Sequence, residues 1–172
     1  MEEAIDLLLD STFAIEAAGD LATDLVALVE AIGARWIRLR PEDKPAYHLA
    51  AVLVSNYLVT LTKLSTDLWA DLGLSADEAR QALVPLIRGV ARSIEGVGIP
   101  ACLTGPVARG DVGTIERHRR VLAERRPDLL AVYRELGLQT VPIALAKGRI
   151  DITRAEELRD TFERCRETAS LT

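Results

Sequence analysis

Aromatic residues are scarce in this sequence: phenylalanine, tryptophan and tyrosine make up 4% of its 172 residues. The apolar fraction is nevertheless 49%, and alanine and leucine dominate it. Sheets are enriched in aromatic and β-branched residues, whereas alanine and leucine favour helices. The composition therefore predicts a mainly helical protein, and the length is that of one ordinary globular unit.

Signals of several protein classes are also missing. The two cysteines, Cys102 and Cys165, belong to no Cys-x-x-Cys pair and no cysteine–histidine cluster, which argues against a disulfide framework and a zinc site. No apolar run approaches the roughly 20 residues that a bilayer requires. The first residues are acidic, whereas a secretory signal begins with basic residues. We therefore expect a cytoplasmic protein with no membrane segment and no bound metal.

A surplus of positive charge is absent as well. Aspartate and glutamate number 26 against 21 lysines and arginines, which gives a formal net charge of −5. Proteins that bind nucleic acids need positive charge to displace counterions from the phosphates. We expect no nucleic-acid partner.

The first forty residues alternate between strand and helix signals. Residues 12–15 read as a strand, Asp20 is placed to cap a helix that Gly33 ends, and residues 36–39 read as a second strand. Two strands joined by one crossover helix leave both outer edges unpaired. This segment is therefore expected to belong to a larger architecture or to pair with another chain.

From residue 41 onward the sequence carries only helix signals. A long Gly/Pro-rich connection is expected over residues 96–113, a length that is typical of functional loops. The first expected helix spans residues 45–72, and the second is opened by the Ser75–Glu78 capping box and runs to about residue 95, with Pro85 inside it. The third is capped by Asp111 and runs to about residue 125, and the fourth starts at Pro127. The last is opened by a capping box at residues 153–156.

The expected helix at 45–72 is apolar almost all round, which predicts a central, buried helix. Its polar exceptions fall on one stripe: His48, Ser55, Thr62 and Thr66, flanked by Asn56 and Lys63. A buried polar stripe must be satisfied by a neighbouring helix or by a ligand, and the pattern leaves both open. In the second case His48 is a candidate acid or base, and Asn56 can orient a carbonyl or carboxylate.

The second candidate region is the loop at residues 103–111. Thr104 offers a hydroxyl, and Arg109 offers a guanidinium that suits a carboxylate or phosphate. The alternative is a tight connection between helices, in which Asp111 is only a helix cap and Arg109 its ion-pair partner.

Two motifs together carry a resemblance to a known family. They are Tyr47-His48-x-Ala50-Ala51 with Ser55-Asn56, and Leu103-Thr104-Gly105-Pro106-x-x-Arg109-Gly110-Asp111-x-x-Thr114 with His118. Residues 12–146 thereby resemble the C-terminal helical domain, of unknown function, in bacterial Rossmann-like proteins related to pyrroline-5-carboxylate reductase, ketopantoate reductase and 6-phosphogluconate dehydrogenase. The resemblance implies that residues 41–172 form a helical bundle like the C-terminal domain of 6-phosphogluconate dehydrogenase. It also implies that residues 1–40 are the terminal β-α-β portion of an incomplete Rossmann domain.

The resemblance further implies a function. It points to the substrate-binding and dimerising helical domain of an NAD- or NADP-dependent oxidoreductase that acts on a small carbonyl or imine acid as a homodimer. His48 would then donate a proton, Asn56 and Ser55 would orient the substrate, and Thr104 and Arg109 would hold its anionic group.

The family's glycine fingerprint is missing from this sequence. No Gly-x-Gly-x-x-Gly motif is present to cradle a pyrophosphate. We therefore expect that this chain binds no dinucleotide by itself and, alone, is inactive. A standalone, non-catalytic oligomerisation or regulatory module is the alternative.

Overall fold

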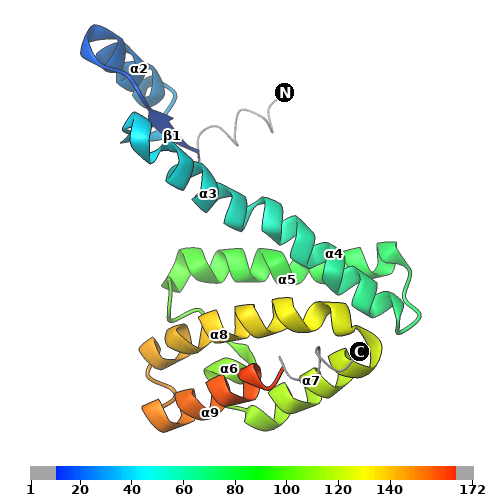
Figure 1. Cartoon of the computed structure of the whole chain (residues 1–172). Helices are drawn as coiled ribbons and strands as arrows, with labels where there is room; N and C mark the ends of the chain where they lie inside the picture. The colour runs from blue at the N-terminus through cyan, green and yellow to red at the C-terminus, as the bar shows by residue number, and fades with distance from the viewer. Residues whose placement is uncertain (1–10, 166–172) are drawn as a thin grey trace. The chain divides into compact units, whose positions relative to one another are not determined.

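The computed structural model describes residues 11–165, which are mainly helical with one two-stranded sheet (Figure 1). The chain divides into two compact units, Met1–Thr60 and Leu61–Thr172, which are here called unit 1 and unit 2. The division falls inside a helix. Each unit is described by itself.

Unit 1 begins with the expected strand, helix and strand. They are β1 (Thr12–Ile15), α2 (Gly19–Ala31) and β2 (Arg35–Arg38). The strands are parallel, with Thr12 opposite Arg35. A small core of Ile15, Val29 and Ala34 holds α2 against them. The expected cap at Asp20 is wrong: Ala18, whose backbone is extended, holds the N-cap position, and Asp20 lies within the first turn.

The sheet is open at both edges within the described part of the chain. Among residues 11–165, β1 and β2 pair with each other and with no third strand. An open sheet edge can pair with a further strand, and open edges are the situation that the strand pattern predicted.

The expected long helix at 45–72 is wrong in two respects. After a short 3-10 turn (η1, Pro41–Asp43), the structure has α3 (Lys44–Val54) and α4 (Asn56–Ala70), separated at Ser55. The ψ angle of Ser55 is −69°, and its Oγ donates to the carbonyl of Ala51 at 2.7 Å, a local bond that bends helices. Secondly, no residue of α3 or α4 is buried, and Val54 is 74% exposed.

Unit 2 contains the remaining helices. They are α5 (Ala76–Val97), α6 (Gly105–Ala108), α7 (Val112–Arg125), the 3-10 turn η2 (Pro127–Leu129), α8 (Leu130–Ala146) and α9 (Ile152–Glu163). Its main core lies between α7, α8 and α9, where Ile115, Val141, Leu158 and Phe162 are fully buried. Gly137 of α8 lets the ring of Phe162 approach the helix backbone closely.

Local helix signals in unit 2 are partly confirmed. The Ser75–Glu78 capping box opens α5, with the backbone N–H of Ser75 bonded to Glu78 at 2.8 Å, and Asp111 caps α7. The capping box expected at residues 153–156 is wrong, because Asp151 caps α9 by accepting from the N–H of Arg154 at 2.8 Å. The connection expected over 96–113 contains the short helix α6.

Within residues 11–165, two helical stretches are long and apolar enough to cross a bilayer by length and composition alone. They are Pro41–Ala70, with a mean hydropathy of 1.3, and Pro127–Ala146, with 1.2. Both are weak indications, since helices that pack in the cores of water-soluble proteins meet the same criterion. Ser55 interrupts the first, and the second supplies core residues to unit 2.

Candidate functional site

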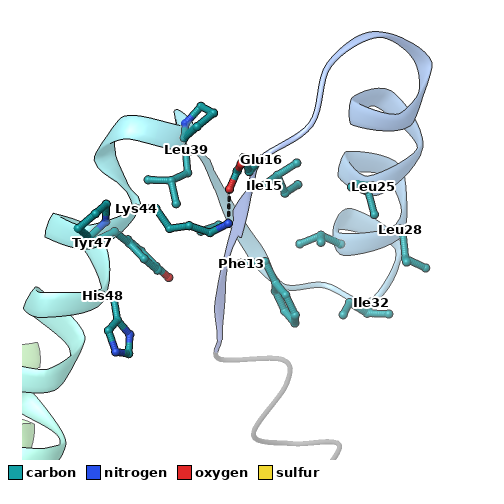
Figure 2. A pocket seen from close by; sticks show the side chains of 14 residues that line it. Phe13, Ile15, Glu16, Leu25, Leu28, Ile32, Leu39, Lys44, Tyr47 and His48 are labelled. Carbon is teal, nitrogen blue, oxygen red and sulfur yellow. Dashed lines mark ion pairs between the residues drawn. The ribbon is translucent and has the colours of Figure 1, made fainter.

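His48 lies at the rim of a large apolar cavity in unit 1 (Figure 2). The cavity has a volume of about 1090 Å³, and β1, α2 and the start of α3 surround it. Tyr47 and His48 extend from α3 on one side, and Leu28 of α2 and Ile32, which directly follows α2, lie across from them. An ion pair between Lys44 Nζ and Glu16 Oε2, at 2.5 Å, joins the start of α3 to the end of β1.

The predicted polar stripe is exposed along its first half and at Lys63, partly buried at Thr62 and Thr66, and largely bonded within its own helices. Thr66 donates to the carbonyl of Thr62 at 2.9 Å, and Lys63 bonds Asp67 at 2.6 Å. The Oγ of Ser55 lies 2.8 Å from Asn56 Oδ1 as well as 2.7 Å from Ala51 O. A hydroxyl has one proton to donate, so these two bonds alternate. The exposed imidazole of His48 is open to solvent or a ligand.

The two other predicted site residues, Thr104 and Arg109, come together in a second cavity, in unit 2. This cavity has a volume of about 420 Å³ and is here called the basic pocket. Its lining also includes Lys147 and Arg149, which follow the end of α8. The remaining lining residues are Leu103, Gly105 and Ala108. Three cationic side chains and one hydroxyl therefore surround one small opening.

Lys147 ties the two sides of the basic pocket together. It is the C-cap residue of α8, and its Nζ donates to the carbonyl oxygens of Ala101 at 2.7 Å and Leu103 at 2.5 Å. Gly148 follows with a φ of +73°, in the left-handed region that favours glycine, and it turns the chain so that Arg149 also lines the pocket. The bonds from Lys147 fix the loop that carries Thr104.

The side chains that face the basic pocket are positive or neutral, since no aspartate or glutamate is among the lining residues. The nearby Asp111 is engaged elsewhere: its oxygens accept from Thr114 N at 2.9 Å and Thr114 Oγ1 at 2.7 Å. These hydrogen bonds hold the pKa of Asp111 below its ordinary value, and the charges of Arg117 and Arg109 act in the same direction. Asp111 is thus the helix cap that the sequence indicated.

The alternative role of Arg109, as ion-pair partner of Asp111, is not what the structure has. Among residues 11–165, neither Arg109 nor Arg149 makes an ion pair or a side-chain hydrogen bond. Thr104 occupies the N-cap position of α6 without a side-chain capping bond. These three side chains are therefore available to a ligand.

Sequence reasoning missed Lys147 and Arg149. The available signal was a pair of basic residues on either side of a helix-ending glycine, a pattern that usually indicates a solvated helix end. Only the packing of α6 beside α8 brings them to Thr104 and Arg109.

His118, part of the second motif, has a structural contact. Its Nδ1 lies 3.1 Å from the hydroxyl of Tyr133, and burial raises the pKa of that phenol far above its ordinary value. Within the described residues, no group of three or more histidine, cysteine or acidic side chains is placed to hold a metal ion.

Comparison with known proteins gives the family. A family model described as "Domain of unknown function (DUF2520)" matches residues 11–140. The chain belongs to the DUF2520 family. No protein of curated function matches the chain. The match covers both units, from β1 into α8, and includes both predicted motifs.

One solved structure is similar over nearly the whole DUF2520 chain. The crystal structure of protein TM1727 from Thermotoga maritima matches with a TM-score of 0.71 and 28% sequence identity. The match covers 96% of this chain and 58% of that one, so this chain spans little more than half the length of TM1727.

Proposed function

We propose that this DUF2520 chain is the substrate-binding and dimerising helical part of an NAD- or NADP-dependent oxidoreductase that acts on a small carbonyl or imine acid. The carrying observation is the basic pocket, where Thr104 and Arg109 lie beside Lys147 and Arg149. A guanidinium with no partner among the described residues is well suited to a carboxylate, because its paired N–H groups match the two oxygens. The acid group of the substrate would bind here.

The proposal also assigns roles in unit 1. His48, whose imidazole is exposed at the rim of the unit 1 cavity, would donate the proton. Asn56 and Ser55 would orient the substrate, and the bond from Ser55 to Asn56 Oδ1 leaves the amide Nδ2 of Asn56 free to donate.

The residues of this chain do not fit a dinucleotide. The turns after β1 and β2 lack the Gly-x-Gly-x-x-Gly sequence that lets a backbone approach a pyrophosphate. We therefore place the cofactor site outside this chain.

The cofactor part of the proposal is tested by titrating NADPH and NADH into this chain and into TM1727, side by side. We expect TM1727 to bind one of them and this chain to bind neither. TM1727 should also oxidise the bound cofactor with a member of a panel of small 2-oxo acids and cyclic imino acids. Failure of TM1727 to bind either dinucleotide would contradict the assignment to oxidoreductases.

The substrate part is tested by binding the same acids to this chain. Arg109→Ala should weaken binding about tenfold, the effect of losing one charge-assisted contact. Arg125→Ala is the matched control: Arg125 is exposed at the last turn of α7, fourteen residues beyond Asp111, or about 20 Å along the helix. Equal effects of the two substitutions would show that the binding is non-specific.

Dimerisation is supported by exposed apolar side chains on α5. Leu86 and Val90, four residues apart on one face, are 60% and 59% exposed, and Ile94 continues the row. Single molecules rarely leave such rows uncovered. Light scattering at tens of micromolar should show a dimer, and Val90→Lys should shift it to the monomer, whereas Arg92→Glu on the same helix should have a smaller effect. A monomeric wild-type chain would contradict this part of the proposal.

The same exposed row also fits the second candidate function, a non-catalytic oligomerisation module. The two candidates differ at the basic pocket. A module that only assembles needs no ligand there, so a chain that dimerises but binds no acid would favour the module.

A further inference from the structure

We infer that the basic pocket takes a dianion, either a dicarboxylate or a phosphate monoester, and not a lone carboxylate. The inference rests on the proposed function for the position of the substrate's anionic group. It goes further by assigning Arg149 and Lys147 to the same ligand as Arg109.

The basic pocket is strongly positive. Arg109, Lys147 and Arg149 contribute three positive charges to a chain whose formal net charge is −5, and no carboxylate lines the opening. One carboxylate would leave two cations facing each other uncompensated. A ligand with two negative charges leaves a residual charge of one, which Lys147 shares with the two carbonyl dipoles that it contacts.

The basic pocket is also rich in hydrogen-bond donors. Arg109 and Arg149 each carry five guanidinium N–H groups, and within residues 11–165 neither side chain bonds a protein acceptor. The ammonium of Lys147 has three donors and uses two of them on Ala101 and Leu103. The residues that line this one pocket thus offer two guanidinium groups, a third ammonium N–H and the hydroxyl of Thr104 as unused donors. A single carboxylate matches one guanidinium, whereas two carboxylates or the three terminal oxygens of a phosphate monoester match both.

Hydrogen bonds and close packing hold the frame of the basic pocket in place. The bonds of Lys147 to the loop join the end of α8 to the segment before α6, and α6 packs against α8. On the neighbouring side, the side chain of Arg154 packs against Gly110, where an added Cβ would lie 2.6 Å from Arg154 Cγ. The cavity of about 420 Å³ lies within the usual range for small-molecule sites, about 300–1,000 Å³. The volume is larger than that of a small dianion.

The test compares three probes on the full chain: acetate, malonate and methyl phosphate, at constant ionic strength and at about pH 8, where a phosphate monoester carries two charges. Two-dimensional NMR titration of the ¹⁵N-labelled chain gives both the dissociation constant and the location, through the amide signals of Gly105 and Gly148. We expect malonate or methyl phosphate to bind at least about tenfold more tightly than acetate. The tighter of the two identifies the source of the dianion.

Variants separate the second charge from the first. Arg149→Gln should reduce dianion binding about tenfold while acetate binding falls less than about threefold, because acetate needs only one guanidinium. Arg109→Gln should weaken all three probes. Arg125→Gln, the exposed control at the far end of α7, should change none.

The outcomes distinguish this inference from the proposed function. If malonate and methyl phosphate bind no more tightly than acetate, and Arg149→Gln has no effect, the dianion is excluded while Arg109 keeps its carboxylate role. If none of the probes shifts the pocket amides, both the dianion and the substrate-anion role are overturned. A uniform effect of Arg125→Gln would show attraction by surface charge alone, which also overturns the inference.

Discussion

The close approach of the Phe162 ring to the backbone of α8 makes Gly137 sensitive to substitution. A Cβ at Gly137 of α8 would lie 2.2 Å from Cε1 and 2.4 Å from Cζ of Phe162 on α9. Carbon atoms in contact are normally about 3.5–4.0 Å apart, so Gly137→Ala requires the ring to move by more than ~1 Å. Phe162 is 1% exposed and lies among Ile115 and Leu158, which are fully buried, so the ring has no free space to enter.

The expected magnitude follows from two opposing contributions. Overpacking a core costs about 1–3 kcal/mol, and a rigid aromatic ring enclosed by buried neighbours calls for the upper value of ~3 kcal/mol. Alanine is favoured over glycine inside a helix by about 1 kcal/mol. The steric contribution wins, and we expect Gly137→Ala to lower the free energy of unfolding by about 2 kcal/mol.

The assay is urea unfolding followed by circular dichroism, with the matched substitution Gly113→Ala as control. A Cβ at Gly113 in α7 would meet its nearest atom, Asp111 Oδ1, at an ordinary 3.6 Å, so that variant should be neutral or up to about 1 kcal/mol more stable. Combining Gly137→Ala with Phe162→Leu should recover part of the loss, because the two sites are coupled. A Gly137→Ala protein as stable as the wild type would refute the described packing of α8 on α9.

Three further predictions concern polar groups. Asp111→Ala should destabilise α7 at neutral pH by removing the bonds to Thr114. Because the pKa of Asp111 is lowered in the folded protein, its contribution to stability is complete above its unfolded pKa of about 3.9 and disappears as the pH falls through the folded value. The urea midpoints of wild type and variant should therefore converge in acid. Burial raises the pKa of Tyr133, so an ultraviolet titration should show an ionisation above the ordinary tyrosine value of about 10, which Tyr133→Phe should abolish. In the wild type, the contribution of this phenol to stability is complete below pH ~10 and falls as the pH rises beyond it. Lys147→Met should cost about 2 kcal/mol of stability in urea unfolding, because two backbone carbonyls lose a charged donor, and an unchanged midpoint would contradict these bonds.

Local chemistry in the sequence predicted local structure well. The strand, helix and strand of unit 1 were visible because residue spacing within a few turns determines which face is apolar. The caps at Ser75 and Asp111 were visible because a capping side chain reaches a backbone N–H three residues away. The cap at Asp151 was missed because it lies only two residues before the capping box expected at residues 153–156, and the helix begins directly after Asp151.

Burial was predicted poorly where it depends on what lies outside a segment. The apolar residues of α3 and α4 indicated a central helix, yet none of them is buried within this chain. A sequence pattern indicates that an apolar surface is costly to expose to water, but it does not indicate which partner covers that surface. The interruption at Ser55 was missed because the competing bond to Ala51 is available to any serine in a helix, and most such residues leave the helix intact.

The basic pocket shows why half of the candidate site was beyond the sequence. Thr104 and Arg109 were identified because they stand in one short loop with unusual glycines, whereas Lys147 is 44 residues beyond Leu103, the carbonyl that it contacts. That contact depends on the position of α8, which the core side chains packed between α8 and α9 hold in place. The charge that would select the ligand is therefore set by apolar packing at Gly137 and Phe162, which carry no charge themselves. A substitution there should weaken anion binding without touching the anion.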